Sequence, residues 1–414
     1  MPRFGGVVIL MQQNLNKENL SGINFMVGDA EVIVRMQKVE SKLPFDESIV
    51  EFLNCLSKKI LAIPQAKTYP DVVTFAFWIR KASVMKMAER FSNEENYLQL
   101  GRGVIFHIAP SNVAVNYAYS FAVGFMTGNA NIVRIPSKEF PQVDIINKAV
   151  EKALEEHPEF KDYICFVRYG REKRINDIFS EMADVRVVWG GDQTIEEIRK
   201  SPLGPRATEV TFADRYSLCV IDSDVYMEVE KKEQFADEFY NDTYLFDQNA
   251  CTSPRLVVWM GNQIEQAKEQ LWSTLFQKVE QKYEYQSIQG VNKLTKAYMF
   301  SAYHEGVSVL ADYDNRLMRV QLETLHKDLM EYRDNSGYFY EYDCKNILDL
   351  KEICNDNHCQ TISYCGNKSM FVPLLKNGIR GVDRIVPIGK TMDFDFIWDG
   401  YNLYERLTRI ISLL

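Results

Sequence analysis

The sequence has little histidine, no long hydrophobic run and no excess of positive charge. Its 5 histidines are scattered over 414 residues, so a histidine-based metal site is not expected. No apolar run approaches the roughly 18 residues that a membrane span needs. The formal net charge is -9, which argues against a surface for nucleic acid or anionic lipid. The first twenty residues show no cleavage-site pattern, so no secretory signal is predicted.

The cysteine spacing also lacks the regularity of a disulfide framework or a zinc site. The 8 cysteines stand at irregular intervals in an ordinary globular composition, which favours reduced thiols in a cytoplasmic protein. A zinc ribbon takes two ligands from one tight turn and needs short paired spacings such as C-x2-C. The densest cluster has no such pair, so no metal is predicted. This cluster comprises Cys344, Cys354, His358, Cys359 and Cys365.

What the sequence does contain is a regular succession of helix and strand patterns. In residues 46–62 and 69–91, apolar residues recur at three- and four-residue intervals near an aspartate suited to capping, which predicts amphipathic helices. From Gly101 onward, short β-rich runs alternate with helical patterns, which predicts parallel βαβ units in a doubly wound sheet. Residues 395–414 predict a turn and a final amphipathic helix. The chain is longer than one core usually serves, and its pattern changes near Asp214, so we expect two α/β domains.

One cysteine occupies an unusual position. Cys251 lies in the polar turn FDQNACTSPR, where Pro254 stops any helix just before the strand-like run LVVWMG. A cysteine that only fills a core would more naturally sit inside the apolar run. Cys251 is therefore a candidate nucleophile, whereas Cys55, Cys165 and Cys219 fit the apolar faces of a helix or a strand.

Three predicted strands end in turns that carry polar or glycine residues. Ligands of open parallel sheets bind beyond the carboxyl ends of the strands. Arg134, Ser137 and Lys138 are suited to ribose hydroxyls or a phosphate at one such end. The pair Gly190 and Gly191 allows a close backbone approach, and the N–H groups of the next helix favour an anion. The three turns are APSN at 109–112, GNANIVRIPSK at 128–138 and WGGDQT at 189–194.

Plainer interpretations compete with each of these features. APSN alone is an ordinary turn, the second segment fits a solvated strand end, and Asp192 is as suited to capping a helix as to meeting a ligand. His107 could donate a proton, but a histidine in a buried strand is more often a hydrogen-bonded core residue. We therefore do not count His107 among the candidate catalytic residues.

In combination, these segments resemble the aldehyde dehydrogenase superfamily and, more narrowly, the acyl-CoA reductase family typified by the LuxC fatty-acid reductase of bacterial bioluminescence. The narrower resemblance rests on HIAPSNVAVN, GNANIVRIPSK, VVWGGDQT, ACTSPR, DRIVPIG and WDG, in family order from about residue 70 to the C-terminus. It implies an aldehyde-dehydrogenase-like fold, with N-terminal helices and a Rossmann-type cofactor domain over 1–213. A catalytic α/β domain would follow over 214–380, and a segment over 381–414 would return to the cofactor domain.

The resemblance also implies roles for individual residues. Cys251 would be the nucleophile, and the Asn112 amide would hold the oxyanion together with the backbone N–H of the nucleophile. Arg134 falls at or beside the position where relatives hold the adenosine ribose with a lysine. The implied cofactor contacts are Pro110, Ser111, Arg134, Ser137, Lys138, Gly190 and Gly191.

One departure from the superfamily bears on the reaction. Hydrolytic aldehyde dehydrogenases carry a water-activating glutamate in an E-L-G-G segment. The corresponding region here, EVTFADRYSLCVID, lacks that segment, and Glu209 is near but out of register. The E-x-F-G-P ribose motif is missing as well. Without a water-activating base, an acyl-enzyme would survive long enough to accept hydride, as in a reductase.

We therefore expect an NADPH-dependent reductase, with NADH as the alternative cofactor, that converts an acyl-CoA or acyl-carrier thioester to an aldehyde through an acyl-cysteine. A CoA-acylating aldehyde dehydrogenase and an acyl-phosphate reductase remain open alternatives, as does a non-catalytic scaffold. The resemblance implies a homo-oligomer and suggests an acyl-transferring partner protein.

Overall fold

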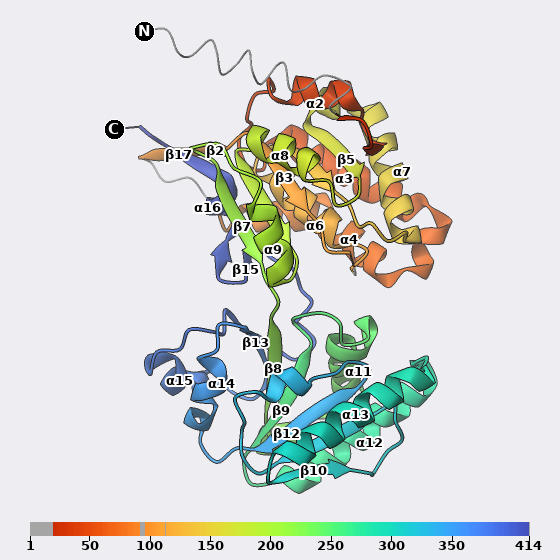
Figure 1. The fold of residues 1–414 in the computed structure, drawn as a ribbon, viewed down its shortest axis with the longest axis vertical. Helices are drawn as coiled ribbons and strands as arrows, with labels where there is room; N and C mark the ends of the chain where they lie inside the picture. Colours follow the sequence, from red (N-terminus) through yellow and green to blue (C-terminus); the bar gives the residue numbers. More distant parts are fainter. Residues whose placement is uncertain (1–19, 92–95, 112, 414) are drawn as a thin grey trace. The chain divides into compact units, whose positions relative to one another are not determined.

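The computed structural model describes residues 20–91, 96–111 and 113–413. Contacts divide the chain into two compact units, residues 1–213 with 401–414 and residues 214–400. Each unit is built on a mainly parallel sheet flanked by helices (Figure 1), so the predicted α/β fold is confirmed. The N-terminal segment without a secretory pattern and the candidate oxyanion donor Asn112 lie outside the described residues.

The sheet of the first unit has the order β1-β5-β4-β3-β6-β7. β1 is antiparallel to β5, and the other neighbours run parallel. β3 is buried along its whole length, as expected for a central parallel strand covered on both faces. The strands are β1 Asn24–Val27, β3 Val104–Ile108, β4 Ala130–Arg134, β5 Ile164–Arg168, β6 Val185–Trp189 and β7 Thr208–Phe212.

The helices of the first unit follow the predicted alternation. Asp46 caps α3 by accepting a hydrogen bond from the Ser48 N–H at 2.9 Å, and Gly128 ends α6 with a φ of 83°. The single helix predicted over 69–91 is instead two helices, α4 and α5. The helices are α2 Ala30–Met36, α3 Glu47–Ala62, η2 Pro64–Thr68, α4 Pro70–Trp78, α5 Lys81–Ala88, α6 Asn116–Met126, α7 Pro141–Glu156, η3 Pro158–Tyr163, α8 Lys173–Met182 and α9 Asp192–Arg199.

The last residues do not form the amphipathic helix that the sequence predicted. A short helix, α16 Leu403–Leu407, is followed by the strand β17 Thr408–Ser412, which pairs antiparallel with β2 Tyr97–Gly101. β16 Tyr401–Asn402 precedes α16. The β-branched residues of TRIIS favour a strand, and β2 provides the partner that local periodicity could not reveal.

The sheet of the second unit has the order β10-β11-β12-β9-β8-β13-β14. β10 is antiparallel to β11, and all other neighbours run parallel. Because β14 pairs with β13, residues 381–400 belong to this unit, and the segment that returns to the first unit begins only at residue 401. The strands of this sheet are β8 Tyr216–Asp222, β9 Pro254–Met260, β10 Val307–Leu310, β11 Met318–Leu322, β12 Tyr338–Asp343, β13 Cys359–Cys365 and β14 Arg384–Pro387. The short strand β15 Ile397–Trp398 lies outside this sheet.

Alternate residues of β8 and β9 enter two apolar clusters on opposite faces of this sheet. Leu218 and Leu256 face one cluster, and Cys219 and Val257 face the other, with Trp272. The helices are α10 Ser223–Glu228, α11 Lys232–Thr243, η4 Tyr244–Phe246, α12 Ile264–Lys282, α13 Ser287–Tyr303, η5 Leu329–Tyr332, η6 Ile347–Leu350, α14 Lys351–Cys354, η7 Lys368–Phe371 and α15 Val372–Lys376.

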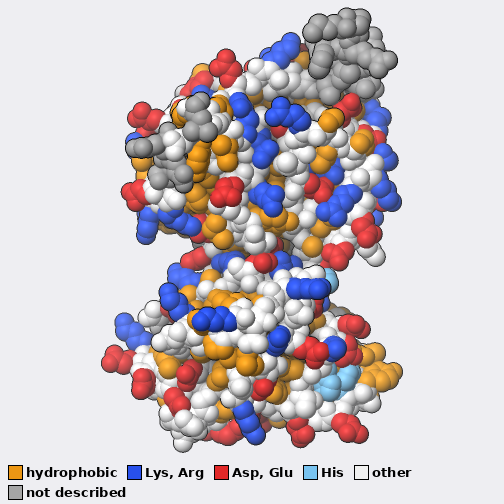
Figure 2. Space-filling view, turned by 90° about the vertical axis from the view of Figure 1, so that its left-hand side faces the viewer, with side chains coloured by type: hydrophobic (Ala, Val, Ile, Leu, Met, Phe, Trp, Pro, Cys, Tyr) orange, Lys and Arg blue, Asp and Glu red, His pale blue; other side chains and the backbone are white. Residues whose placement is uncertain are grey.

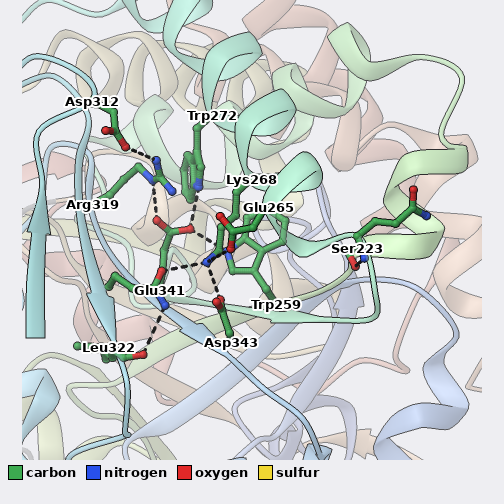
Figure 3. A network of polar contacts seen from close by, with 12 residues as sticks. Ser223, Trp259, Glu265, Lys268, Trp272, Asp312, Arg319, Leu322, Glu341 and Asp343 are labelled. Atoms are coloured by element: carbon green, nitrogen blue, oxygen red, sulfur yellow. Dashed lines mark hydrogen bonds and ion pairs between the residues drawn. The ribbon is translucent and has the colours of Figure 1, made fainter. Parts of the chain in front are cut away.

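A buried carboxylate in β12 organises the polar side chains near the carboxyl end of this sheet (Figure 3). Glu341 is fully buried, and its Oε2 accepts hydrogen bonds from the indoles of Trp259 and Trp272, each at 2.8 Å. Its Oε1 accepts from Arg319 at 2.6 Å, and Arg319 also pairs with Asp312 at 3.0 Å. Both carboxylate oxygens therefore have donors, which is the condition for tolerating a buried charge.

The surface side chains show no segregation of charge by sign on the face drawn in Figure 2, where lysine, arginine, aspartate and glutamate are interspersed. Among the described residues, no helix is long and apolar enough to cross a membrane.

Candidate active site

Cys251 lies between η4 and β9, immediately before the amino end of that strand. β9 is flanked by β8 and β12, and β8 in turn pairs with β13. The candidate nucleophile thus lies at the amino ends of the parallel strands in its own unit, opposite to the edge where open parallel sheets bind their ligands. A strand, not a helix, follows Cys251, so no helix N-terminus begins there to favour the thiolate.

The side chain of Gln248 anchors the loop that carries Cys251. Gln248 is fully buried, and its Oε1 accepts hydrogen bonds from the N–H groups of Gly337 and Tyr338, both at 3.0 Å. Its Nε2 donates to the carbonyls of Pro254 and Tyr338, both at 3.1 Å. The amide therefore ties the loop to the start of both β9 and β12. Gln248 also has a φ of 57°, a left-handed conformation that a non-glycine residue seldom adopts.

Further contacts fix the backbone on either side of the cysteine. The Ser217 hydroxyl donates to the Cys251 carbonyl at 2.8 Å, and the Arg255 guanidinium donates to the Gln248 carbonyl at 2.7 Å. Asp247 has a φ of 54° and accepts a hydrogen bond from the Tyr283 hydroxyl. The sequence predicted the cysteine but not this framework, whose parts lie up to about ninety positions apart.

The Cys251 thiol is protonated at neutral pH. The residue as a whole is partly exposed, and all eight cysteines are free thiols. Burial and the nearby Asp399 carboxylate raise the pKa of Cys251 to about 12, although the Gln360 amide and the Arg215 charge act in the opposite direction. A nucleophilic role therefore requires a group that accepts the thiol proton.

Asp399 and Gln360 form a buried polar pair beside Cys251. The Gln360 amide nitrogen donates to Oδ1 of Asp399. Burial raises the pKa of Asp399 to about 6, while the hydrogen bond from Gln360 and the Arg215 charge lower it. Within the described chain, Oε1 of Gln360 is buried without a hydrogen-bond partner. In the sequence, Asp399 stood out only as part of the family segment WDG, and no local pattern indicated a role for Gln360.

In the first unit, the three predicted turns follow strands that lie side by side. β3 pairs with both β4 and β6, and Ile108 at the end of β3 is in register with Arg134 and Val188. Pro110 and Ser111 follow β3, and Ser111 is exposed. The turns therefore share one edge of the sheet, the carboxyl edge where dinucleotides bind in this class of fold.

The predicted cofactor residues differ in how open they are. Arg134 donates to the Gly170 carbonyl at 3.0 Å, and its guanidinium lies 4.5 Å from the Tyr169 ring centre, so it faces the end of β5. Ser137 and Lys138 are exposed. Lys138 remains at the surface, 5.1 Å from the centre of a phenylalanine ring.

The glycine turn after β6 leaves room for a ligand. A side chain at Gly191 would meet no atom within 4 Å, whereas one at Gly190 would touch Thr194. Gly191 is the N-cap of α9 and Asp192 is its first residue, so Asp192 is not the cap that the sequence suggested. An open backbone at a helix N-terminus fits the diphosphate of a nicotinamide cofactor.

His107 and Glu209 both have structural partners. His107 is fully buried between the Ser120 hydroxyl at 2.7 Å and Oδ1 of Asn131 at 3.0 Å. Burial lowers the pKa of His107 to about 4, which agrees with its interpretation as a neutral core residue. Glu209 accepts hydrogen bonds from Arg186 at 2.9 Å and Arg199 at 2.7 Å, so its carboxylate is held in ion pairs.

The late cysteine cluster is mostly core. Its four cysteines are buried, and His358 pairs with Asp356 at 2.9 Å. Over the residues that the structure describes, no group of three or more histidine, cysteine, aspartate or glutamate side chains is placed to hold a metal ion.

Comparison with known sequences identifies similar proteins of one family. The family model described as acyl-CoA reductase (LuxC) matches residues 83–410. A long-chain acyl-protein thioester reductase of Photorhabdus laumondii is 24% identical over 337 residues, which are 79% of this chain and 67% of that protein. The enzyme of the same name from Vibrio harveyi is 21% identical over 75% of this chain and 64% of its own length. The chain thus spans about two thirds of these relatives.

Comparison with solved structures identifies the fold. A 3,6-anhydro-L-galactose dehydrogenase in complex with NAP superposes with a TM-score of 0.62 at 13% identity, covering 92% of this chain and 90% of that one. An indole-3-acetaldehyde dehydrogenase of P. syringae in complex with NAD+ gives 0.64 at 11% identity, covering 98% and 88%. The fold is that of the aldehyde dehydrogenases.

Proposed function

The chain belongs to the acyl-CoA reductase (LuxC) family, and from this premise we propose that it reduces an acyl-CoA or acyl-protein thioester to an aldehyde through an acyl group on Cys251. The observation that carries the proposal is the thiol of a partly exposed residue on an anchored loop, near a carboxylate that has no ion pair within the described chain. Such a thiol has the access and the fixed position that a nucleophile needs.

The first half of the reaction is an exchange of thioesters. Cys251 attacks the acyl carbon, the original thiol leaves, and the bond formed resembles the bond broken, so the enzyme mainly has to supply a thiolate and stabilise the oxyanion. The Asn112 amide would be one oxyanion donor. Asn112→Ala is then expected to lower turnover by on the order of 100- to 1,000-fold while cofactor binding is kept. Turnover near that of the wild type would mean that Asn112 is misassigned.

The second half needs a nicotinamide cofactor, which would supply the hydride that converts the acyl-enzyme to an aldehyde. Gly190 and Gly191 would receive its diphosphate, and Pro110 and Ser111 lie at the same edge of the sheet. We propose NADPH, because the exposed Lys138 is available for a 2′-phosphate, whereas Arg134 is held by carbonyls of the β5 end. NADH is the alternative.

Hydride transfer, not hydrolysis, is the proposed fate of the acyl group. Glu209, the glutamate nearest to the water-activating position in sequence, is engaged by two arginines. A carboxylate held in this way is a poor base for water. The proposal therefore predicts an acyl-enzyme that persists until the cofactor is present.

The decisive experiment is incubation of the protein with a panel of acyl-CoAs without cofactor, followed by intact-protein mass spectrometry. An acyl adduct on the wild type that is absent from Cys251→Ala supports the proposal and names the acyl length. Addition of NADPH should then release the adduct with loss of absorbance at the nicotinamide band. No adduct with any thioester would contradict it.

The other expectations concern direction and assembly. A CoA-acylating aldehyde dehydrogenase and an acyl-phosphate reductase would use the same cysteine. An assay with aldehyde and CoA as substrates tests the first alternative, and an assay with acyl phosphate as substrate tests the second. A scaffold would keep its cellular role in Cys251→Ala. We also propose a homo-oligomer that receives acyl groups from a partner protein, which size measurement and co-purification test.

A further inference from the structure

Asp399 places a buried carboxylate beside Cys251. It is 8% exposed, and its Oδ1 accepts a hydrogen bond from the fully buried amide of Gln360. Ser217, whose hydroxyl donates to the Cys251 carbonyl at 2.8 Å, is in register with Thr361, the residue after Gln360. The Gln360 amide also lowers the pKa of Cys251. The loop of the cysteine and the Gln360–Asp399 pair therefore lie at the start of the same strands, although their residues are about 110 and 40 positions apart.

The two arginines whose charges act on Asp399 make their contacts with other groups. Arg215 forms an ion pair with Asp383 at 2.7 Å. Arg384 donates to three backbone carbonyls and lies 4.1 Å from the centre of an indole ring. Among the described residues, neither forms an ion pair with Asp399. A carboxylate with one hydrogen bond and no ion pair keeps the capacity to accept a proton.

The thiol needs such an acceptor, because its pKa is raised to about 12. A base works best when its own pKa lies near the working pH, and that of Asp399 is raised by burial to about 6. The other charges facing the thiol are arginines, which have no proton-accepting form near neutral pH. The charged groups that act on Cys251 or Asp399 are Arg215, Arg255, Asp383 and Arg384.

We propose that Asp399 accepts the proton of the Cys251 thiol during acyl transfer and returns it to the departing thiol, with Gln360 as a positioning residue. The inference rests on the proposed function and names the proton acceptor of that same site. The S–H bond of Cys251 breaks as its bond to the acyl carbon forms, and the proton moves to Asp399. The thioester C–S bond then breaks, and the leaving thiolate takes the proton from Asp399. No electrons are transferred, and no further reactant is needed.

Asp399→Asn removes the base with little change of shape. Asp399 has a φ of 49°, in the left-handed region where asparagine and aspartate are the most readily accommodated of the non-glycine residues. Asparagine can still accept the hydrogen bond from Gln360. The variant is therefore expected to fold, and a thermal unfolding curve checks that it does.

The first measurement is the rate of Cys251 alkylation by iodoacetamide between pH 5 and 10, followed at the Cys251 peptide by mass spectrometry. Proton transfer from Cys251 to Asp399 leaves the net charge unchanged, so the thiolate formed this way does not vary with pH once Asp399 is ionised. Just above about pH 6, where Asp399 is ionised, the rate in the wild type should rise less steeply with pH than it does below pH 6. In Asp399→Asn it should rise about tenfold per pH unit throughout this range. A tenfold rise per unit in the wild type as well would overturn the proposal.

The second measurement is the rate of Cys251 acylation by octanoyl-CoA, read by rapid quenching and intact mass. Loss of a general base should slow acyl transfer in Asp399→Asn by on the order of 100-fold. An unchanged acylation rate, with slower loss of the acyl group to water, would assign the carboxylate to water activation and overturn the proposal. Asp393→Asn is the matched control, because that exposed carboxylate pairs with Lys390 and should leave both rates unchanged within about twofold.

The two measurements separate this inference from the proposed function. A flattened pH dependence of alkylation above about pH 6, in a protein that octanoyl-CoA and other acyl-CoAs fail to acylate, would support the proton transfer and reject the thioester reaction. Acylation without this flattening would support the thioester reaction and reject Asp399 as the proton acceptor.

Discussion

Two buried carboxylates of the second unit differ in how completely they are hydrogen-bonded. Glu341 receives hydrogen bonds from two indoles and an arginine (Figure 3). Asp399 receives one from Gln360 and has no ion pair within the described chain. A carboxylate whose two oxygens both accept hydrogen bonds holds its surroundings together, whereas one with few donors keeps a free position for a proton. The difference agrees with a structural role for Glu341 and with the proposed role of Asp399 as a proton acceptor.

The largest effect is expected when the complete network is broken. Glu341→Gln places an amide N–H₂ against one of the existing donors and leaves Arg319 with only the exposed Asp312 as a partner. Breaking a buried pair in this way typically lowers the free energy of unfolding by about 3 to 5 kcal/mol. Denaturant unfolding measures the loss, and the Cys251 alkylation rate of the folded protein should not change. A Glu341→Gln variant as stable as the wild type would contradict the structural role of Glu341.

At Asp399, which has few hydrogen-bond donors, a substitution is expected to raise the free energy of unfolding instead of lowering it. The pKa of Asp399 is raised to about 6 in the folded protein, above the value of about 3.9 for an unfolded chain. The folded state therefore binds its proton more tightly and loses stability as the pH rises through this window. The carboxylate then costs about 2 to 3 kcal/mol at pH 7. Asp399→Asn should be more stable than the wild type by about this amount at pH 7, when measured by urea unfolding.

The same comparison can be made by pH alone. Between about pH 4 and 6, the difference in unfolding free energy between Asp399→Asn and the wild type should grow from near zero to its full size. Both proteins share every other titrating group, so their difference isolates Asp399. A difference that is constant from pH 4 to 8 would show that the carboxylate does not titrate in this window.

The smallest effect on stability is expected at the partly exposed edge of the Glu341 network. Lys268 pairs with Asp343 at 2.6 Å, and that carboxylate is 40% exposed. Partly exposed pairs contribute little, so Lys268→Met should change the unfolding free energy by about 1 kcal/mol or less. A loss as large as that of Glu341→Gln would mean that the network acts as one unit and not as a core with a rim.

The sequence predicted well what depends on local pattern. Alternating strand and helix patterns fixed the order of elements from β3 to α9, because each apolar run and its breakers lie within about fifteen residues. Cys251 could be singled out as a candidate because a polar turn around a cysteine is itself a local signal. The predicted cofactor residues share one sheet edge for the same reason, since each follows a strand.

What escaped prediction depends on partners distant in sequence. The last strand, β17, pairs with β2 some three hundred residues earlier. Because this partner is distant in sequence, the periodicity of the segment alone predicted a helix where the structure has a strand. The anchoring of Gln248 to Tyr338 and the link from Gln360 to Asp399 join loops that no local pattern connects. The position of Cys251 at amino ends of parallel strands likewise follows from sheet topology, which periodicity does not contain.

The strand β17 has a consequence for how the protein is made. It completes the small sheet with β2, and the Leu407 carbonyl just before it accepts a hydrogen bond from the buried Asn129 amide at 3.0 Å. All residues of the second unit, 214–400, are synthesised before this strand. Domains generally fold as units during synthesis. The second unit can therefore reach its final structure before the first unit, which began earlier, has received its last strand.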